Sequence, residues 1–144
     1  MVKSARRRAR ELAVQALYQW QLAGQTTDFI EKQIAEGKEF AKADQAYFRL
    51  LFSNTVKQSD ALKATLIPNL DRGFAELSPI ESSILLLAGY ELVHQPDIPY
   101  RVVINEAVEL AKVFGGTDGH KYVNGVLDKF ANNVRSTEIN ARRV

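Results

Sequence analysis

Four arginines crowd the start of the chain, which reads MVKSARRRARELAVQALYQW. They are Arg6, Arg7, Arg8 and Arg10, and Lys3 precedes them. Arginine presents its N–H groups as a planar fork that matches the oxygens of a phosphate group. A helix is predicted here, and its N-terminus is already partly positive, so each exposed cation costs about 0.3–1 kcal/mol. Because helix stability does not require these charges, we expect nucleic-acid phosphates to offset their mutual repulsion.

An aromatic residue extends this cluster. Arg6, Arg10, Val14 and Tyr18 follow at four-residue spacing, which predicts that they share one helix face, directed away from the core. Arginines beside an exposed ring suit single-stranded nucleic acid, with phosphates on the guanidinium groups and a base stacked on tyrosine. The spacing fits half-buried packing of Tyr18 equally well.

Two other patterns resemble catalytic or metal sites. The stretch ELVH at 91–94 is a Glu-x-x-His motif, but a di-iron site needs it twice, and Thr117 stands three residues before the other histidine, His120. Glu106 and Glu109 lie one turn apart without a nucleophile or a glycine-rich phosphate loop. The chain also has no cysteine. We therefore expect no enzymatic activity, no metal and no cofactor.

A second polar cluster opens the stretch DGHKYVNGVLD at 118–128. Asp118, Lys121 and Tyr122 crowd the start of a predicted helix, where an anion binds well. Gly125 lies inside that helix, where glycine costs about 1 kcal/mol relative to alanine, and close approach of another helix is the usual reason for it. A capped helix with a solvated first turn is an equally good interpretation.

The elements that must position these residues are helices. The first carries a buried stripe of apolar residues at three- and four-residue spacing: Ala5, Ala9, Leu12, Ala13, Ala16, Leu17 and Trp20. Caps, glycines and prolines predict further helices over about 28–37, 44–67, 79–94, 102–114 and 118–131. NLDRGFAEL, near residue 70, is a linker or a short helix. The pattern predicts an all-α protein with about six to seven helices.

The fourth of these helices has the clearest start signal. In SPIE, Ser78 is the expected N-cap, Pro79 the first helical residue and Glu81 the partner of a capping box. The helix is apolar on most sides, which predicts a place in the middle of a bundle.

Charge is concentrated at the ends of the chain. The net charge is +2, but residues 11–144 carry 14 basic and 17 acidic groups, so any polyanion should bind locally. We expect a single domain over 1–144, with a basic arm at 3–10 and a frayed basic tail at 132–144. No segment is long and apolar enough to cross a bilayer, so we expect a soluble cytoplasmic protein without membrane contact.

Four stretches resemble the NusB family of bacterial transcription antitermination factors: ARRRARELAVQALYQW, SPIESSILLLAGYEL, IPYRVVINEAVELAKVFG and HKYVNGVLDK. The resemblance covers nearly the whole chain and is weakest over 25–75. It implies two small helical bundles of the three-helix type packed together. It also implies binding to boxA RNA jointly with the ribosomal protein NusE, in an RNA polymerase complex that reads through terminators in ribosomal RNA operons.

The resemblance also implies site residues. Lys3, Arg6, Arg7, Arg10 and Tyr18 would face RNA. The helix start at 118–122 would add Asp118, Lys121 and Tyr122, while Glu81 would meet NusE.

Two alternatives stay open. The chain could be a helical protein–protein adaptor that does not bind RNA, and a homodimer could cover the exposed side of the central helix. If the RNA-binding interpretation is correct, Arg7→Ala or Arg10→Ala should weaken RNA binding without loss of stability.

Overall fold

The computed structural model describes residues 3–115 and 118–142, leaving out the side chain of residue 142. Within these ranges all regular structure is helical, with eight α-helices and three short 3₁₀-helices. The α-helices are α1 (Ala5–Ala23), α2 (Thr27–Ala35), α3 (Gln45–Lys57), α4 (Ser59–Leu66), α5 (Pro79–His94), α6 (Tyr100–Phe114), α7 (Gly119–Val134) and α8 (Ser136–Arg142). The 3₁₀-helices are η1 (Lys38–Lys42), η2 (Ile67–Asn69) and η3 (Phe74–Glu76).

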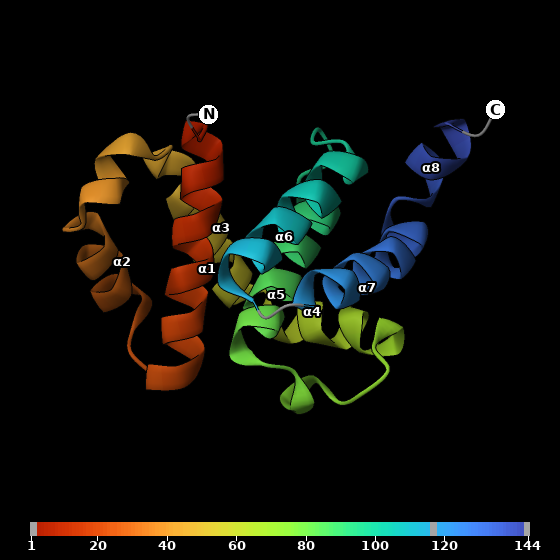
Figure 1. The fold of residues 1–144 in the computed structure, drawn as a ribbon, viewed down its shortest axis with the longest axis horizontal. Helices are drawn as coiled ribbons and strands as arrows, with labels where there is room; N and C mark the ends of the chain where they lie inside the picture. The colour runs from red at the N-terminus through yellow and green to blue at the C-terminus, as the bar shows by residue number, and fades with distance from the viewer. Residues whose placement is uncertain (1–2, 116–117, 143–144) are drawn as a thin grey trace.

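The helices form two bundles that meet along α5, which confirms the predicted all-α architecture. Figure 1 shows α1, α2 and α3 on the left and the green-to-blue helices α4 to α8 on the right. Helix α5 contacts α1 and α3 of the first bundle and α4, α6 and α7 of the second. Its N-cap and first residue are as predicted, since Ser78 Oγ accepts the Glu81 backbone N–H at 3.1 Å and Pro79 is the first helical residue.

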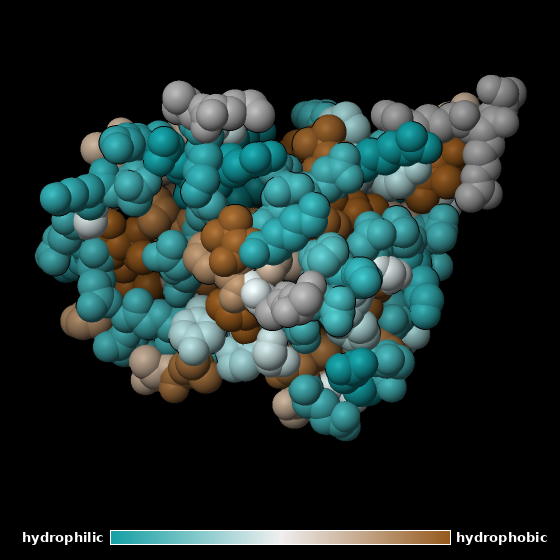
Figure 2. Space-filling view, in the orientation of Figure 1, coloured by the Kyte–Doolittle hydropathy of each residue, from teal (hydrophilic) through white to brown (hydrophobic). Residues whose placement is uncertain are grey.

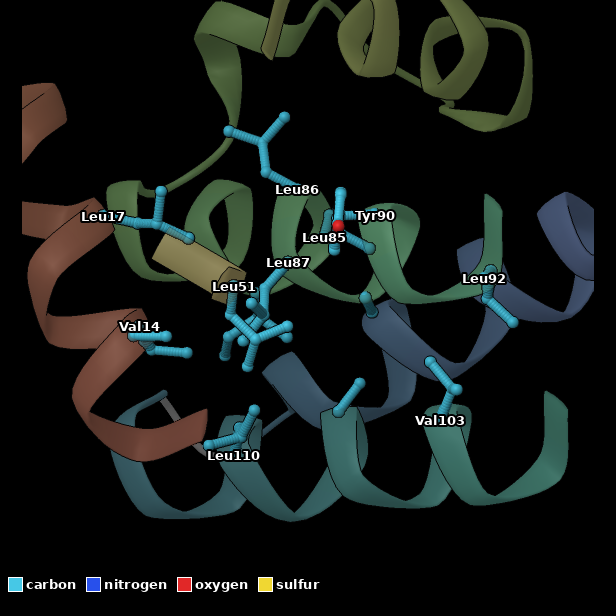
Figure 3. Packing of buried hydrophobic residues seen from close by; sticks show 14 of the residues in the cluster. Val14, Leu17, Leu51, Leu85, Leu86, Leu87, Tyr90, Leu92, Val103 and Leu110 are labelled. Carbon is cyan, nitrogen blue, oxygen red and sulfur yellow. The ribbon is translucent and has the colours of Figure 1, made fainter. Parts of the chain in front are cut away.

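The core surrounds α5. Residues 82–92 of this helix are all buried. In Figure 3 its leucines lie between Val14 and Leu17 of α1 and Val103 and Leu110 of α6, with Leu51 of α3 close to Leu87. A helix surrounded by neighbours has no wet face to fill with polar residues, which explains its apolar sequence.

Three boundaries differ from the prediction. The expected helix over 44–67 is two helices, because the backbone leaves helical geometry at Gln58, between α3 and α4. Thr26, rather than Asp28, caps α2. The tail expected to fray from residue 132 continues as α7 and α8 instead. These breaks and the ordered tail account for the eight α-helices among the described residues, rather than six or seven.

The side chain of Arg135 holds the tail in place. It is 6% exposed and donates to the carbonyl oxygens of Leu92 at 2.7 Å, Gln95 at 2.9 Å and Ile98 at 2.9 Å. It also pairs with Glu138 at 2.6 Å. The last carbonyls of a helix have no partner within the helix. Arg135 therefore supplies those partners for the end of α5 and fixes α7 and α8 against it.

Candidate nucleic-acid interface

The basic arm, residues 3–10, forms the first turns of α1. Ser4 caps the helix, since its Oγ accepts the Arg7 backbone N–H at 3.0 Å. The first turn of α1 contains no acidic residue, so no side chain of that turn balances the charges that oppose the helix dipole.

Carboxylates of the same chain balance these charges. Each cation of the arm lies 2.7–3.8 Å from a carboxylate oxygen: Lys3 with Glu11, Arg6 with Asp44, Arg7 with Glu106, Arg8 with Glu39 and Arg10 with Glu91. The expectation that nucleic-acid phosphates are needed to offset the repulsion is therefore wrong. Any phosphate that binds the arm meets guanidinium groups already held in place.

Arg10 is a structural residue, and its predicted position on the exposed face is wrong. Its side chain is 5% exposed, and Nε and Nη2 donate to the Glu91 carboxylate at 3.1 and 2.9 Å. The Tyr47 hydroxyl donates to the same carboxylate. Burial lowers the pKa of Arg10, but the hydrogen bond and charge of Glu91 outweigh burial and raise it. Arg10, Tyr47 and Glu91, here called the buried triad, join α1, α3 and α5.

Helix geometry explains why the four-residue spacing misled for Arg10. Each step of four residues turns about 40° beyond a full rotation. The series therefore runs from exposed Arg6 through buried Arg10 and Val14 to exposed Tyr18. Arg10 and Val14 face the helices packed against α1, while Arg6 and Tyr18, at the two ends of the series, lie at the edges of this buried face.

Arg6 and Arg7 keep solvent-facing donors, as predicted. Their side chains are 51% and 41% exposed. The guanidinium carbon of Arg6 lies 3.9 Å from the centre of the Tyr47 ring, which fixes its orientation. Arg7 directs Nε and Nη2 at one oxygen of Glu106. These two side chains line a cavity of about 200 Å³ between α1 and α6, together with Lys3 and Glu109. Figure 2 shows hydrophilic surface around the start of α1.

Tyr18 is 38% exposed, so part of its side chain is accessible while the rest is covered, which fits both interpretations of its spacing. With Gln15, Leu22, Ile80 and Phe114 it lines a groove of about 480 Å³ between α1, the start of α5 and the end of α6. The groove is mostly apolar, and its aromatic rings, Tyr18 and Phe114, are of the kind on which bases stack.

The second predicted cluster lies at the start of α7, partly as expected. Asp118 and Lys121 are exposed and pair with each other at 3.5 Å. Of the two residues that could cap this helix, Asp118 forms no side-chain cap bond, and Thr117 lies outside the described residues. Tyr122 is half-buried, with the Arg72 guanidinium carbon 4.5 Å from its ring centre. Burial, followed by the Asp71 carboxylate, raises the pKa of Tyr122.

The first turn of α5 connects the two clusters. Ile80 lines the groove of Tyr18, and Glu81 Oε1 lies 3.4 Å from the position that a Cβ atom would take at Gly119. Glu81 is half-buried there. The predicted partner residue therefore lies between the predicted RNA-facing groups rather than on a separate surface.

Arg72 and the partners of Arg10 were not predicted. Arg72 belongs to the stretch NLDRGFAEL, whose irregular pattern carries no helical period. Glu91 drew attention only as part of a metal motif, although a carboxylate inside so apolar a helix signals a buried counter-charge.

In the described ranges no cluster of three or more His, Cys, Asp or Glu side chains could hold a metal ion, and no helix is long and apolar enough to cross a membrane. An all-helical fold with cationic and aromatic groups on one surface defines a helical binding protein. The NusB family model matches residues 7–132, and the chain belongs to the NusB family.

Individual relatives agree with this assignment. The chain is 54% identical to the transcription antitermination protein NusB of Thiobacillus denitrificans, over 94% of this chain and 93% of that protein. The solved structure of T. maritima NusB matches with a TM-score of 0.79 and 29% identity, over 92% and 93% of the two chains. A chain from a structure of the antitermination factors NusB and NusE with double-stranded RNA matches with a TM-score of 0.81 and 26% identity, over 90% and 97%. The family is non-enzymatic, as the sequence predicted.

Proposed function

We propose that this chain is a transcription antitermination factor that binds boxA RNA together with NusE. It works in the cytoplasm, in the RNA polymerase complex that transcribes ribosomal RNA operons. Family membership and the NusB neighbour solved with NusE and RNA support this function. The observation that carries it is the pair of exposed guanidinium groups of Arg6 and Arg7, held in fixed orientation at the edge of α1.

RNA phosphates would bind the donors of the arm that its own carboxylates leave free. Glu106 occupies Nε and Nη2 of Arg7, which leaves its remaining guanidinium donors for a phosphate. Arg6 lies 3.8 Å from Asp44, a distance too long for a hydrogen bond. Tyr18 offers a ring for base stacking, and the start of α7 adds Asp118, Lys121 and Tyr122. Arg10 takes no part in phosphate contact in this proposal and positions α1 instead.

Arg7→Ala is expected to weaken binding to single-stranded boxA RNA and to reduce its salt dependence. One lost phosphate contact lowers the slope of log K against log salt by about 0.7. Stability should change by less than about 1 kcal/mol, because the ion pair with Glu106 is partly exposed. Fluorescence anisotropy over a salt titration measures both quantities. The control is Lys57→Ala, at the end of α3 that lies away from the arm. This variant should bind RNA like the wild type.

Glu106→Gln is expected to strengthen RNA binding several-fold at low salt. The change removes the negative charge that competes with phosphate for Arg7, while Arg10 keeps Glu91. The gain should shrink as salt screens the competing charge. Glu109→Gln removes a charge one turn away that pairs with Lys112 instead, so it controls for long-range effects. Equal gains for the two variants would contradict direct competition at Arg7.

The adaptor alternative and the kind of RNA are tested together. Wild-type protein is titrated with single-stranded boxA RNA and with a duplex of the same sequence, each with and without NusE. Tighter binding of the single strand in the presence of NusE supports the proposal. Binding of NusE without binding of either RNA would instead support the alternative that the chain is a protein–protein adaptor.

A further inference from the structure

Gly125 has no structural reason to be glycine. It lies in the middle of α7, and a Cβ atom built there meets nothing within 4 Å. The expectation that another helix packs closely against it is therefore wrong. Its φ angle is not in the left-handed region, and alanine is the better helix former. The fold alone would favour a side chain at this position.

The surroundings of Gly125 form a small basic groove. Lys121, Gly125 and Lys129 follow at four-residue spacing along α7, and Asn69, Asp71 and Tyr122 complete a cavity of about 200 Å³. Lys121 pairs only with the exposed Asp118, and Lys129 forms no ion pair with any described residue. Arg72 covers the Tyr122 ring and pairs with Asp71 at 2.7 Å, so the carboxylate that lines the groove already has a cationic partner.

We propose that this groove, between η2 and α7, is a further RNA-binding site in which the phosphodiester backbone crosses α7 directly over Gly125. This inference rests on the proposed function and extends the RNA surface beyond Asp118, Lys121 and Tyr122. Lys121 and Lys129 lie two turns apart, about 12 Å along the axis, and each takes a phosphate. Glycine between them removes the side chain that would hold the chain away from the helix.

Charge and position favour RNA over a protein as the occupant. The unpaired charge of the groove is positive, and the groove continues from the predicted RNA contacts at Lys121 and Tyr122. A bare backbone flanked by two cations suits a narrow polyanion, whereas a protein partner would gain from apolar side chains here.

Gly125→Ala and Gly125→Leu test the proposal, because both residues form helices better than glycine. The melting temperature should rise by about 2–5 °C in each variant. Affinity for single-stranded boxA RNA should nevertheless fall, and for leucine by about tenfold, the equivalent of one charge-assisted hydrogen bond. Asn124→Leu adds the same side chain at the neighbouring exposed position, and RNA affinity should be unchanged. Lys129→Gln should lower the salt slope by about 0.7.

The outcomes separate this inference from the proposed function. If the wild type binds RNA and Arg7→Ala weakens binding, but the Gly125 variants and Lys129→Gln bind normally, the groove is not an RNA site and the inference fails alone. If these variants lose affinity for NusE and not for RNA, the groove belongs to the protein partner and the inference is again overturned. If the wild type binds no RNA, the proposed function fails first.

Discussion

Glu91→Ala is expected to lower the free energy of unfolding by about 3–5 kcal/mol, the usual cost of leaving a buried charge without its partner. Glu91 is 2% exposed and accepts hydrogen bonds from Arg10 and Tyr47. Without it, the Arg10 guanidinium keeps only Glu106, 3.7 Å away, and the Tyr47 hydroxyl loses its acceptor. Urea unfolding followed by circular dichroism measures the loss.

A double variant separates the charge from the packing. Arg10→Met with Glu91→Leu removes both charges and keeps an apolar volume, and stability should recover to within about 1 kcal/mol of the wild type or exceed it. Glu91→Gln retains the shape of the side chain, and its stability should lie between that of Glu91→Ala and that of the double variant. A loss of less than about 1 kcal/mol for Glu91→Ala would show that the triad is not the buried network that the geometry describes.

Arg135→Ala is expected to cost about 2–4 kcal/mol, because it removes the donor that the carbonyl oxygens of Leu92 and Ile98 share and one of the two donors to Gln95. Arg135→Lys should recover little of this loss, since one ammonium group cannot reach carbonyls that a fork spans. Thermal unfolding measures the change in stability. Lys112→Ala is the control, because it removes only an exposed ion pair on α6 and should have little effect on stability.

Hydrogen exchange gives an independent test of the same residue. Amides of α8 should lose protection in Arg135→Ala, while those of α1 keep it. Equal protection of α8 in the variant and the wild type would mean that the tail is held by its apolar contacts, such as the buried Ile139, and not by Arg135.

Local patterns predicted most of the fold. Four consecutive residues predicted the start of α5, and apolar spacing predicted the buried stripe of α1 from Ala9 to Leu17, although Ala5, expected in it, is exposed. These signals act within one or two turns of helix, so they can be read from a short stretch. The break at Gln58 was not predicted, because neither glycine nor proline marks it and the helical period continues across it.

The site could be predicted only in part. Arg6, Arg7 and Tyr18 are exposed, but Arg10 is not, and its partner Glu91 lies 81 residues away. Arg135 likewise binds carbonyls about 40 residues before it. Spacing within one helix cannot show which distant helix covers it. The sequence therefore located the basic arm but not the carboxylates that hold it.

These distant pairings have a consequence for the order of events during synthesis. Arg10 leaves the ribosome 81 residues before its partner Glu91, and Arg7 leaves it 99 residues before its partner Glu106. Asp44 and Glu39, the partners of Arg6 and Arg8, emerge much earlier, so α1 can pack against α3 before α5 and α6 complete its contacts. A nascent chain thus carries Arg7 and Arg10 without their carboxylate partners until α5 and α6 have emerged, and the recognition surface is complete only late in translation.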